Sequence, residues 1–133
     1  MRAIKFRGKC AKDSRYAGEW VYGGLLQCKK SKDVLIVYSI TDTCSCTYHV
    51  DPATVGQFTE LKDRHGNEIY EGDIVLYNGN KRVVEHEECT FGLSHHENGF
   101  PFEPFCKLPI PLRKCVVVGN IHDSPELLKG GAS

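Results

Sequence analysis

The 133-residue sequence has no excess of charge of either sign and no long apolar run. Lysine plus arginine number 17, as do aspartate plus glutamate, so the formal net charge is zero. A dedicated nucleic-acid-binding protein usually carries a basic excess, because neutralising phosphates supplies much of its affinity. No stretch approaches the roughly 18 to 20 apolar residues that cross a bilayer, and the first residues lack the apolar core of a signal peptide. These absences predict a cytoplasmic protein with no membrane partner.

The sequence is rich in cysteine, and the number of cysteines is odd. The seven positions are Cys10, Cys28, Cys44, Cys46, Cys89, Cys106 and Cys115. An odd count without an export signal favours reduced thiols over a disulfide framework. A chain of this length buries about two-thirds of its unfolded surface, which suffices for a core. We expect one domain over residues 1–129, with a possible subdivision near residue 54 and a disordered tail at 130–133.

Short alternating or β-branched segments separated by turn residues predict an all-β fold. Residues 34–38 are almost wholly apolar and read as a central strand. Asn78-Gly79 is a strong hairpin signal between the strand expected at 73–77 and the one expected at 82–87. Gly23-Gly24 predicts a bulge or bend in an earlier strand. We expect a strand-rich front half and a back half that curls into a small β-barrel like an SH3 domain.

Two segments depart from this pattern. The stretch from Ser94 to Pro111 holds four prolines, so it cannot be a continuous central strand, and we expect an ordered loop there. Near the end, Ser124 suits an N-cap and Pro125 the first helical position. The sequence therefore predicts one short C-terminal helix.

Three stretches together resemble one protein family. They are residues 4–7 (IKFR), residues 54–75, which include TVGQFTELKD and EIYEGDIV, and residues 118–128 (VGNIHDSPELL). This pattern is similar to the YopX family of small phage and prophage proteins. The family commonly has glycine where Glu60 stands and a larger aromatic residue where His122 stands. The resemblance implies a mostly β architecture, a phage or prophage origin and a bacterial cytoplasm. It implies no reaction and provides no catalytic residues.

The central block of this pattern has a structural interpretation. Gly66 and Gly72 suit turn positions with positive φ. Glu71 and Asp73 flank a tight turn and can accept hydrogen bonds from its backbone N–H groups. Asn120 suits a bulge or a clamp between side chain and backbone. We therefore expect these residues to build the scaffold.

Two hypotheses of a metal site stay open, although the sequence predicts no cofactor. In the first, the carboxylates of Glu68, Glu71 and Asp73 bind a divalent cation or act as acid and base. In the second, five soft or borderline ligands form a tetrahedral zinc site. These zinc candidates are Cys44, Cys46, His49, His86 and Cys89.

The leading functional hypothesis is a non-enzymatic binding or assembly module. Small β domains expose edges and loops that suit self-association or contact with a phage or host protein. The aromatic side chains of Phe100, Phe102 and Phe105 in the proline-rich stretch are the candidate contact surface. Because no local nucleophile signature surrounds any cysteine, we do not expect an enzyme.

The alternative hypothesis is a nucleic-acid-binding β-barrel. Four basic residues near the N-terminus could contact phosphates, and Trp20 and Tyr22 could stack on bases. The basic residues are Lys5, Arg7, Lys9 and Lys12. The zero net charge argues against this alternative.

Overall fold

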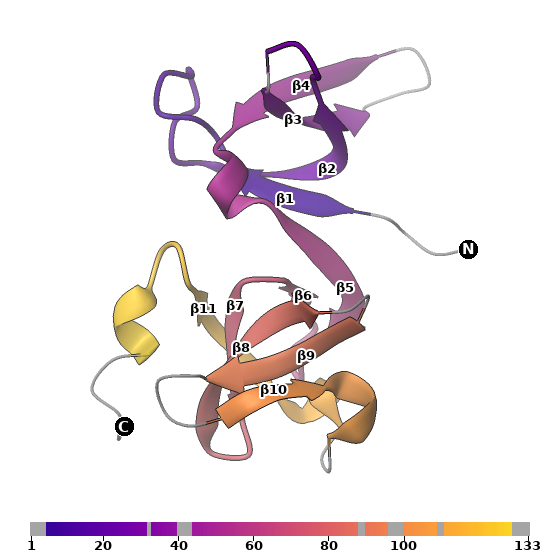
Figure 1. The fold of residues 1–133 in the computed structure, drawn as a ribbon, viewed down its shortest axis with the longest axis vertical. Helices are drawn as coiled ribbons and strands as arrows, with labels where there is room; N and C mark the ends of the chain where they lie inside the picture. Colours follow the sequence, from indigo (N-terminus) through magenta and orange to yellow (C-terminus); the bar gives the residue numbers. More distant parts are fainter. Residues whose placement is uncertain are drawn as a thin grey trace. The chain divides into compact units, whose positions relative to one another are not determined.

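The computed structural model describes residues 5–31, 33–39, 44–87, 90–95, 100–108 and 111–128. The strands lie in two antiparallel sheets, which confirms the expected all-β class (Figure 1). The chain forms two compact units, Met1–Phe58 and Thr59–Ser133, so the division falls within a strand. The predicted disordered tail at 130–133 lies outside the described residues.

The first unit is an antiparallel meander. Its elements are β1 (Phe6–Lys9), β2 (Trp20–Gln27), β3 (Val34–Ser39), β4 (Ser45–Val50), the 3-10 turn η1 (Pro52–Thr54) and the beginning of β5 (Gly56–Lys62). Strands β1 to β4 pair in chain order, and β1 also pairs with β5. Ile36 is completely buried in this unit, so a central strand forms where the apolar run predicts it.

Strand β2 changes partner in its middle, which curls the meander. Gly23 pairs with Phe6 of β1, and Gly24 pairs with Val37 of β3. A Cβ at Gly23 would collide with the carbonyl oxygen of Val37, so only glycine permits this close approach. The bend expected at Gly23-Gly24 is therefore confirmed. The curl brings the end of β4 beside β1, where a single bridge joins Cys10 to Val50.

The second unit contains the rest of β5 and a five-stranded sheet in the order β10-β9-β8-β7-β11. Its elements are β6 (Glu68–Tyr70), β7 (Asp73–Tyr77), β8 (Asn80–Glu87), β9 (Thr90–His95), β10 (Phe100–Pro104), β11 (Val116–Asn120) and the 3-10 turns η3 (Phe105–Lys107), η4 (Leu112–Lys114) and η5 (Pro125–Leu128). The predicted hairpin between β7 and β8 is confirmed, because Asn78 and Gly79 have φ of 49° and 81°. The core of this unit comprises Ile69, Val75, Tyr77, Val84, Leu93, Leu112 and Cys115.

The predicted SH3-like barrel does not form, because the five-stranded sheet stays open. In the described residues its outer strands are β10 and β11, and they do not pair with each other. Pro101 and Pro104 deprive β10 of two backbone donors. On β11, the N–H of Val117 donates to the Asp63 carboxylate instead of to a strand. Neither edge can therefore offer a full row of partners for closure.

The stretch from Ser94 to Pro111 is not the long loop expected from its prolines. Ser94 belongs to β9, and residues 100–104 form β10, which pairs with β9. The prolines are tolerated because β10 is an edge strand. Gly92 allows the pairing, since a Cβ there would lie 2.6 Å from the Phe102 ring. The sequence excluded a central strand correctly but missed this edge strand.

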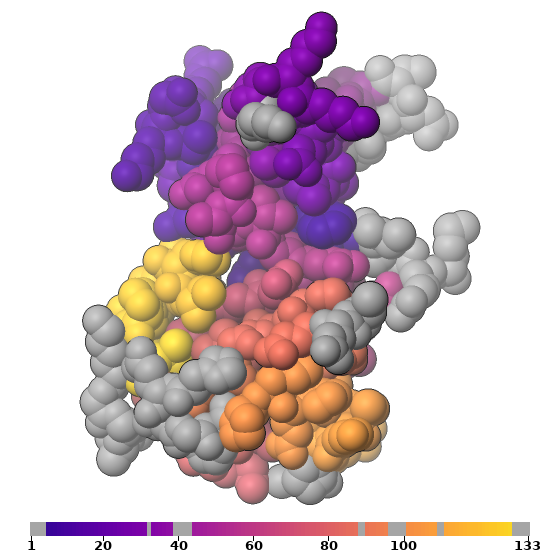
Figure 2. Space-filling view, in the orientation of Figure 1, coloured from indigo at the N-terminus to yellow at the C-terminus, as the bar shows by residue number. Residues whose placement is uncertain are grey.

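The predicted C-terminal helix is a single 3-10 turn, η5. The N–H of Leu127 donates to the carbonyl of Ser124 at 3.0 Å, so the chain turns where the cap residue predicts. Four helical residues are too few to propagate an α-helix. Figure 2 shows this segment, in yellow, at the surface of the molecule. Within the described ranges, no helix has the length and apolar character needed to cross a membrane.

The family-like residues of the centre build turns, as expected. Gly66 and Gly72 have φ of 85° and 93°. Asp73 is buried, and its carboxylate accepts the N–H of Tyr70 at 2.7 Å across the turn. Asn120 accepts the N–H groups of residues 122 and 123 through its side-chain oxygen, which confirms the clamp. These residues therefore have structural roles that require no ligand.

Candidate functional site

Within each unit, the described zinc candidates do not converge on one point. Successive side chains of a strand point to opposite faces, so Cys46 and His49 of β4 face opposite ways. In the second unit, the ring of His86 packs edge-on against Phe91, with centroids 4.7 Å apart. Cys89 lies outside the described residues. In the part of the chain that the structure covers, no three histidine, cysteine or acidic side chains could hold one metal ion.

The carboxylates of the second hypothesis are engaged in the second unit's own structure. Glu68 accepts the hydroxyl of Tyr70 at 2.9 Å, and Asp73 accepts the N–H of the same residue. Glu71 is half-buried at the turn between them. The arrangement fits a braced turn better than an open acidic site.

Two of the three aromatic residues proposed as a contact surface, Phe102 and Phe105, pack largely within the second unit. Phe102 lies against Gly92, and the ring of Phe105 stacks on Phe91 with centroids 6.3 Å apart. Phe105 also packs against the buried core. Phe100 begins β10, where its backbone pairs with His95. Phe102 and Phe105 are half-buried, so most of their apolar surface already has a use in folding.

Two of the four basic candidates, Arg7 and Lys9, lie on β1 of the first unit, and Lys5 directly precedes that strand. The Arg7 guanidinium lies 4.7 Å from the centroid of the Trp20 ring, and the Lys9 amine lies 5.9 Å from it. The Lys5 amine lies 5.1 Å from the centroid of the Phe58 ring. Arg7 is only 6% exposed, which limits its contact with a phosphate. Lys12 is not on this strand but in the loop after it.

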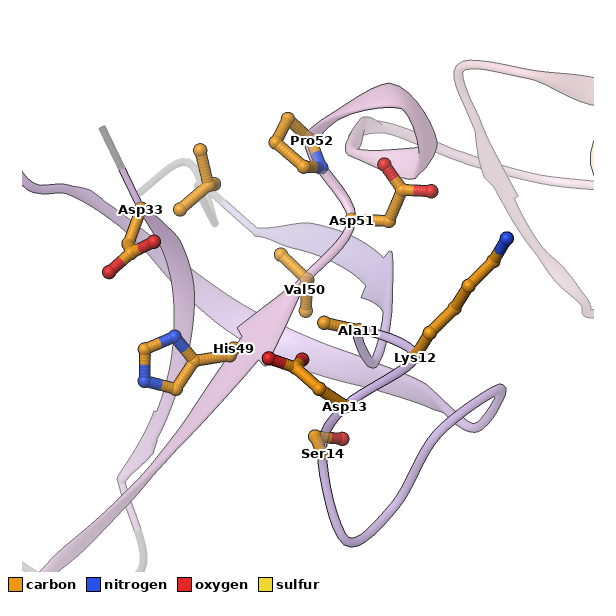
Figure 3. Close-up of a pocket in the computed structure, with 10 residues that line it drawn as sticks. Ala11, Lys12, Asp13, Ser14, Asp33, His49, Val50, Asp51 and Pro52 are labelled. Carbon is orange, nitrogen blue, oxygen red and sulfur yellow. The ribbon is translucent and has the colours of Figure 1, made fainter. Parts of the chain in front are cut away.

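A hollow of about 470 Å³ with polar and apolar lining opens on the first unit. Three segments line it: residues 11–14, 33–34 and 49–52 (Figure 3). They contribute the carboxylates of Asp13, Asp33 and Asp51 together with the imidazole of His49. The Asp51 carboxylate already accepts the N–H of Ala53 at 3.1 Å, which caps η1. The hollow has room for a small polar group, and its lining is more acidic than basic.

The outer edge of β4 is an end of the six-stranded sheet. His49 uses its carbonyl to accept the N–H of Ala11 at 3.0 Å, away from β3. Alternate residues of an antiparallel strand point both backbone groups to one side. Ser45 and Thr47 therefore direct their N–H and C=O groups away from β3 as well. No strand of the described part of the chain pairs with them there.

Sequence reasoning missed this edge. Residues 45–50 show alternating exposure, as in any half-buried strand, and sequence alone does not tell which strands are outermost. The available signals were the lack of charged residues and of proline in this stretch.

The fold and these sites define the chain as a two-unit all-β protein. It belongs to the YopX family, whose model, described as YopX protein, matches residues 5–129. The chain is also similar to the crystal structure of protein EF1440 from Enterococcus faecalis, with 20% sequence identity and a TM-score of 0.54. That match covers 97% of this chain and 100% of the other, and at this identity it shows a shared fold alone. No curated protein matches the chain.

Proposed function

We propose that this YopX-family protein is a non-enzymatic assembly module that self-associates through the open edge of β4. The observation that carries the proposal is the pair of residues Ser45 and Thr47, whose backbone groups point outward without a strand beside them. An unpaired edge is a template for another strand. From the family, we further propose that it is a phage or prophage protein that acts in the bacterial cytoplasm.

The contrast between β4 and the two outer strands of the five-stranded sheet supports this choice. Strand β10 carries Pro101 and Pro104, and proline cannot donate to an added strand. On β11, Asp63 accepts the N–H of Val117 at 2.9 Å. Proline and charged side chains on an edge strand usually prevent it from pairing with another strand. Strand β4 contains neither.

The overall charge favours a second copy over a strongly charged partner. A net charge near zero gives little mutual repulsion between copies and favours association. Two β4 strands would also meet without like charges opposite each other, because Ser45–Val50 contains none of Asp, Glu, Lys or Arg.

Sedimentation velocity over a concentration series tests the proposal. Thr47→Pro removes an outward N–H and no bond to β3, so circular dichroism should show an intact fold. We expect the unmodified protein to shift toward a dimer with concentration and Thr47→Pro to stay monomeric. Thr47→Ala keeps the N–H and is the matched control, which should behave like the unmodified protein. A monomer at every concentration, or equal association of Thr47→Pro, would contradict the proposal.

Nucleic-acid binding is the second candidate, supported by the basic side chains beside Trp20. A base that stacks on this ring should quench the fluorescence of the single tryptophan. Titration with a single-stranded oligonucleotide at low salt measures this directly, since phosphate contacts are strongest there. Unchanged fluorescence and no mobility shift would remove this candidate.

A further inference from the structure

The backbone directions of β4 restrict how two copies can pair, if the proposed self-association occurs. Ser45 and Thr47 face outward, whereas Cys46 and Tyr48 face β3 with their backbone groups. In an antiparallel pair, outward residues must lie opposite outward residues. The two-fold axis that relates the copies must therefore lie at one residue of β4, so that this residue lies opposite the same residue of the second copy. An axis midway between two residues would place outward residues opposite inward ones.

Among the axes on residues 45 to 47, one makes full use of the open edge. An axis at Thr47 would set Ser45 of one copy opposite His49 of the other, whose carbonyl already accepts from Ala11. An axis at Ser45 pairs only Ser45 with itself within β4. An axis at Cys46 pairs Ser45 with Thr47 of the second copy twice, and each pair exchanges two hydrogen bonds.

We propose that a second copy of this chain adds to β4 in antiparallel orientation, with Cys46 of the two copies opposite each other at the two-fold axis. This register leaves the Ala11–His49 bond of each copy intact. The hydrogen bonds between the two copies join only Ser45 and Thr47, because β4 begins at Ser45, and they do not extend to His49. Serine and threonine opposite each other are compatible cross-strand neighbours.

The register places two thiols at a non-hydrogen-bonded pair position. The Cα atoms of such a pair lie about 4.5 Å apart, and the Cβ atoms about 4.5 to 5.5 Å. Cys46 is free and half-buried, so its thiol is within reach of a reagent. Cys44, two residues earlier, would lie opposite Tyr48 of the second copy and not opposite a thiol.

Crosslinking with a short bismaleimide tests the register. Each maleimide adds one thiol across its double bond, so a reagent that captures both Cys46 side chains yields a covalent dimer. We expect the unmodified protein and Cys44→Ser to give this dimer and Cys46→Ser to lose it. Mass spectrometry should identify the Cys46–Cys46 peptide, and mixing ¹⁴N- and ¹⁵N-labelled protein shows whether the link joins two chains.

The outcomes separate this register from the proposed function. Cys46→Ser should still sediment as a dimer, because its backbone bonds are unchanged. A dimer that Thr47→Pro abolishes but that never crosslinks through Cys46 overturns the register and leaves self-association through β4 in place. A protein that is monomeric in sedimentation overturns both.

Discussion

Replacement of Asp63 should strongly destabilise the second unit. Its Oδ1 accepts the N–H groups of His65 and Asn67, each at 2.9 Å. Its Oδ2 accepts the N–H of Val117 at 2.9 Å and the Asn67 side-chain amide at 3.3 Å. One side chain that is 5% exposed thus fastens a turn to a strand 54 residues away.

The expected magnitude follows from the donors left without an acceptor. A hydrogen bond to a charged group contributes about 1.5 to 3 kcal/mol, and such bonds are not additive. Asp63→Ala removes the acceptor of all four bonds, three of which come from the backbone N–H groups of His65, Asn67 and Val117. We expect a loss of about 3 to 4 kcal/mol in the free energy of unfolding. Asp63→Asn keeps one carbonyl oxygen and should lose about 2 kcal/mol.

The loss of unfolding free energy in the Asp63 variants should depend on pH. Burial alone would raise the pKa of Asp63, but the bonds from Val117, Asn67 and His65 outweigh burial and hold the pKa below its ordinary value of 3.8. A lowered pKa in the folded state means that the ionised carboxylate stabilises the fold above the unfolded value. This contribution disappears as the pH falls through the folded value. The gap between the unmodified protein and Asp63→Asn should therefore narrow in acid.

Urea denaturation followed by circular dichroism, at neutral pH and in acid, measures this gap. Hydrogen exchange of peptides within residues 59–77 shows whether the loss of stability lies in the second unit. Trp20 fluorescence cannot show this, because Trp20 belongs to the first unit. Asp13→Ala, an exposed carboxylate in the first unit's loop, is the control. If Asp63→Ala loses no more than this control, or the gap is equal at both pH values, the reasoning fails.

Three further outcomes follow from single residues. Glu60 has φ of 71°, so Glu60→Gly should raise the urea midpoint by relieving about 1 kcal/mol of strain, whereas Glu60→Ala should not. Gly92→Ala should lose β10 protection in hydrogen exchange, because its Cβ would lie 2.5 Å from the backbone carbonyl oxygen of Glu103 and 2.6 Å from the ring of Phe102; adding Phe102→Leu should not restore it, since the backbone clash remains. Burial and nearby carboxylates raise the pKa of Cys115 to about 11, so at pH 8 maleimide should modify exposed Cys44 far faster than Cys115.

Features with local causes were predictable from the sequence. Asn78-Gly79 forms a hairpin because both residues accept positive φ, and this needs no distant partner. Gly66 and Gly72 follow the same logic. The glycine expected from the family at position 60 has a physical reason too, since this chain keeps the left-handed backbone there with glutamate.

Features that depend on distant pairing were not predictable. Turn chemistry indicates that Asp63 bonds to its own loop, but not that it accepts from Val117. The prolines of β10 exclude a central strand, yet Gly92 of β9 must lie opposite Pro104 of β10 before an edge strand can form. The barrel expectation failed for the same reason, since closure requires two particular edges to meet.

The position of β4 as an outer strand is a further property of topology, and it makes the absence of charge there meaningful. On an inner strand, uncharged residues such as Ser45 and Thr47 would need no explanation, since neighbours would occupy both edges. On an outer strand the same residues leave backbone donors and acceptors open to another chain. The fold limits this opening at one end, where Ala11 bonds to His49. The result is a short edge with room for one strand in a defined register, which suits specific pairing better than open-ended aggregation.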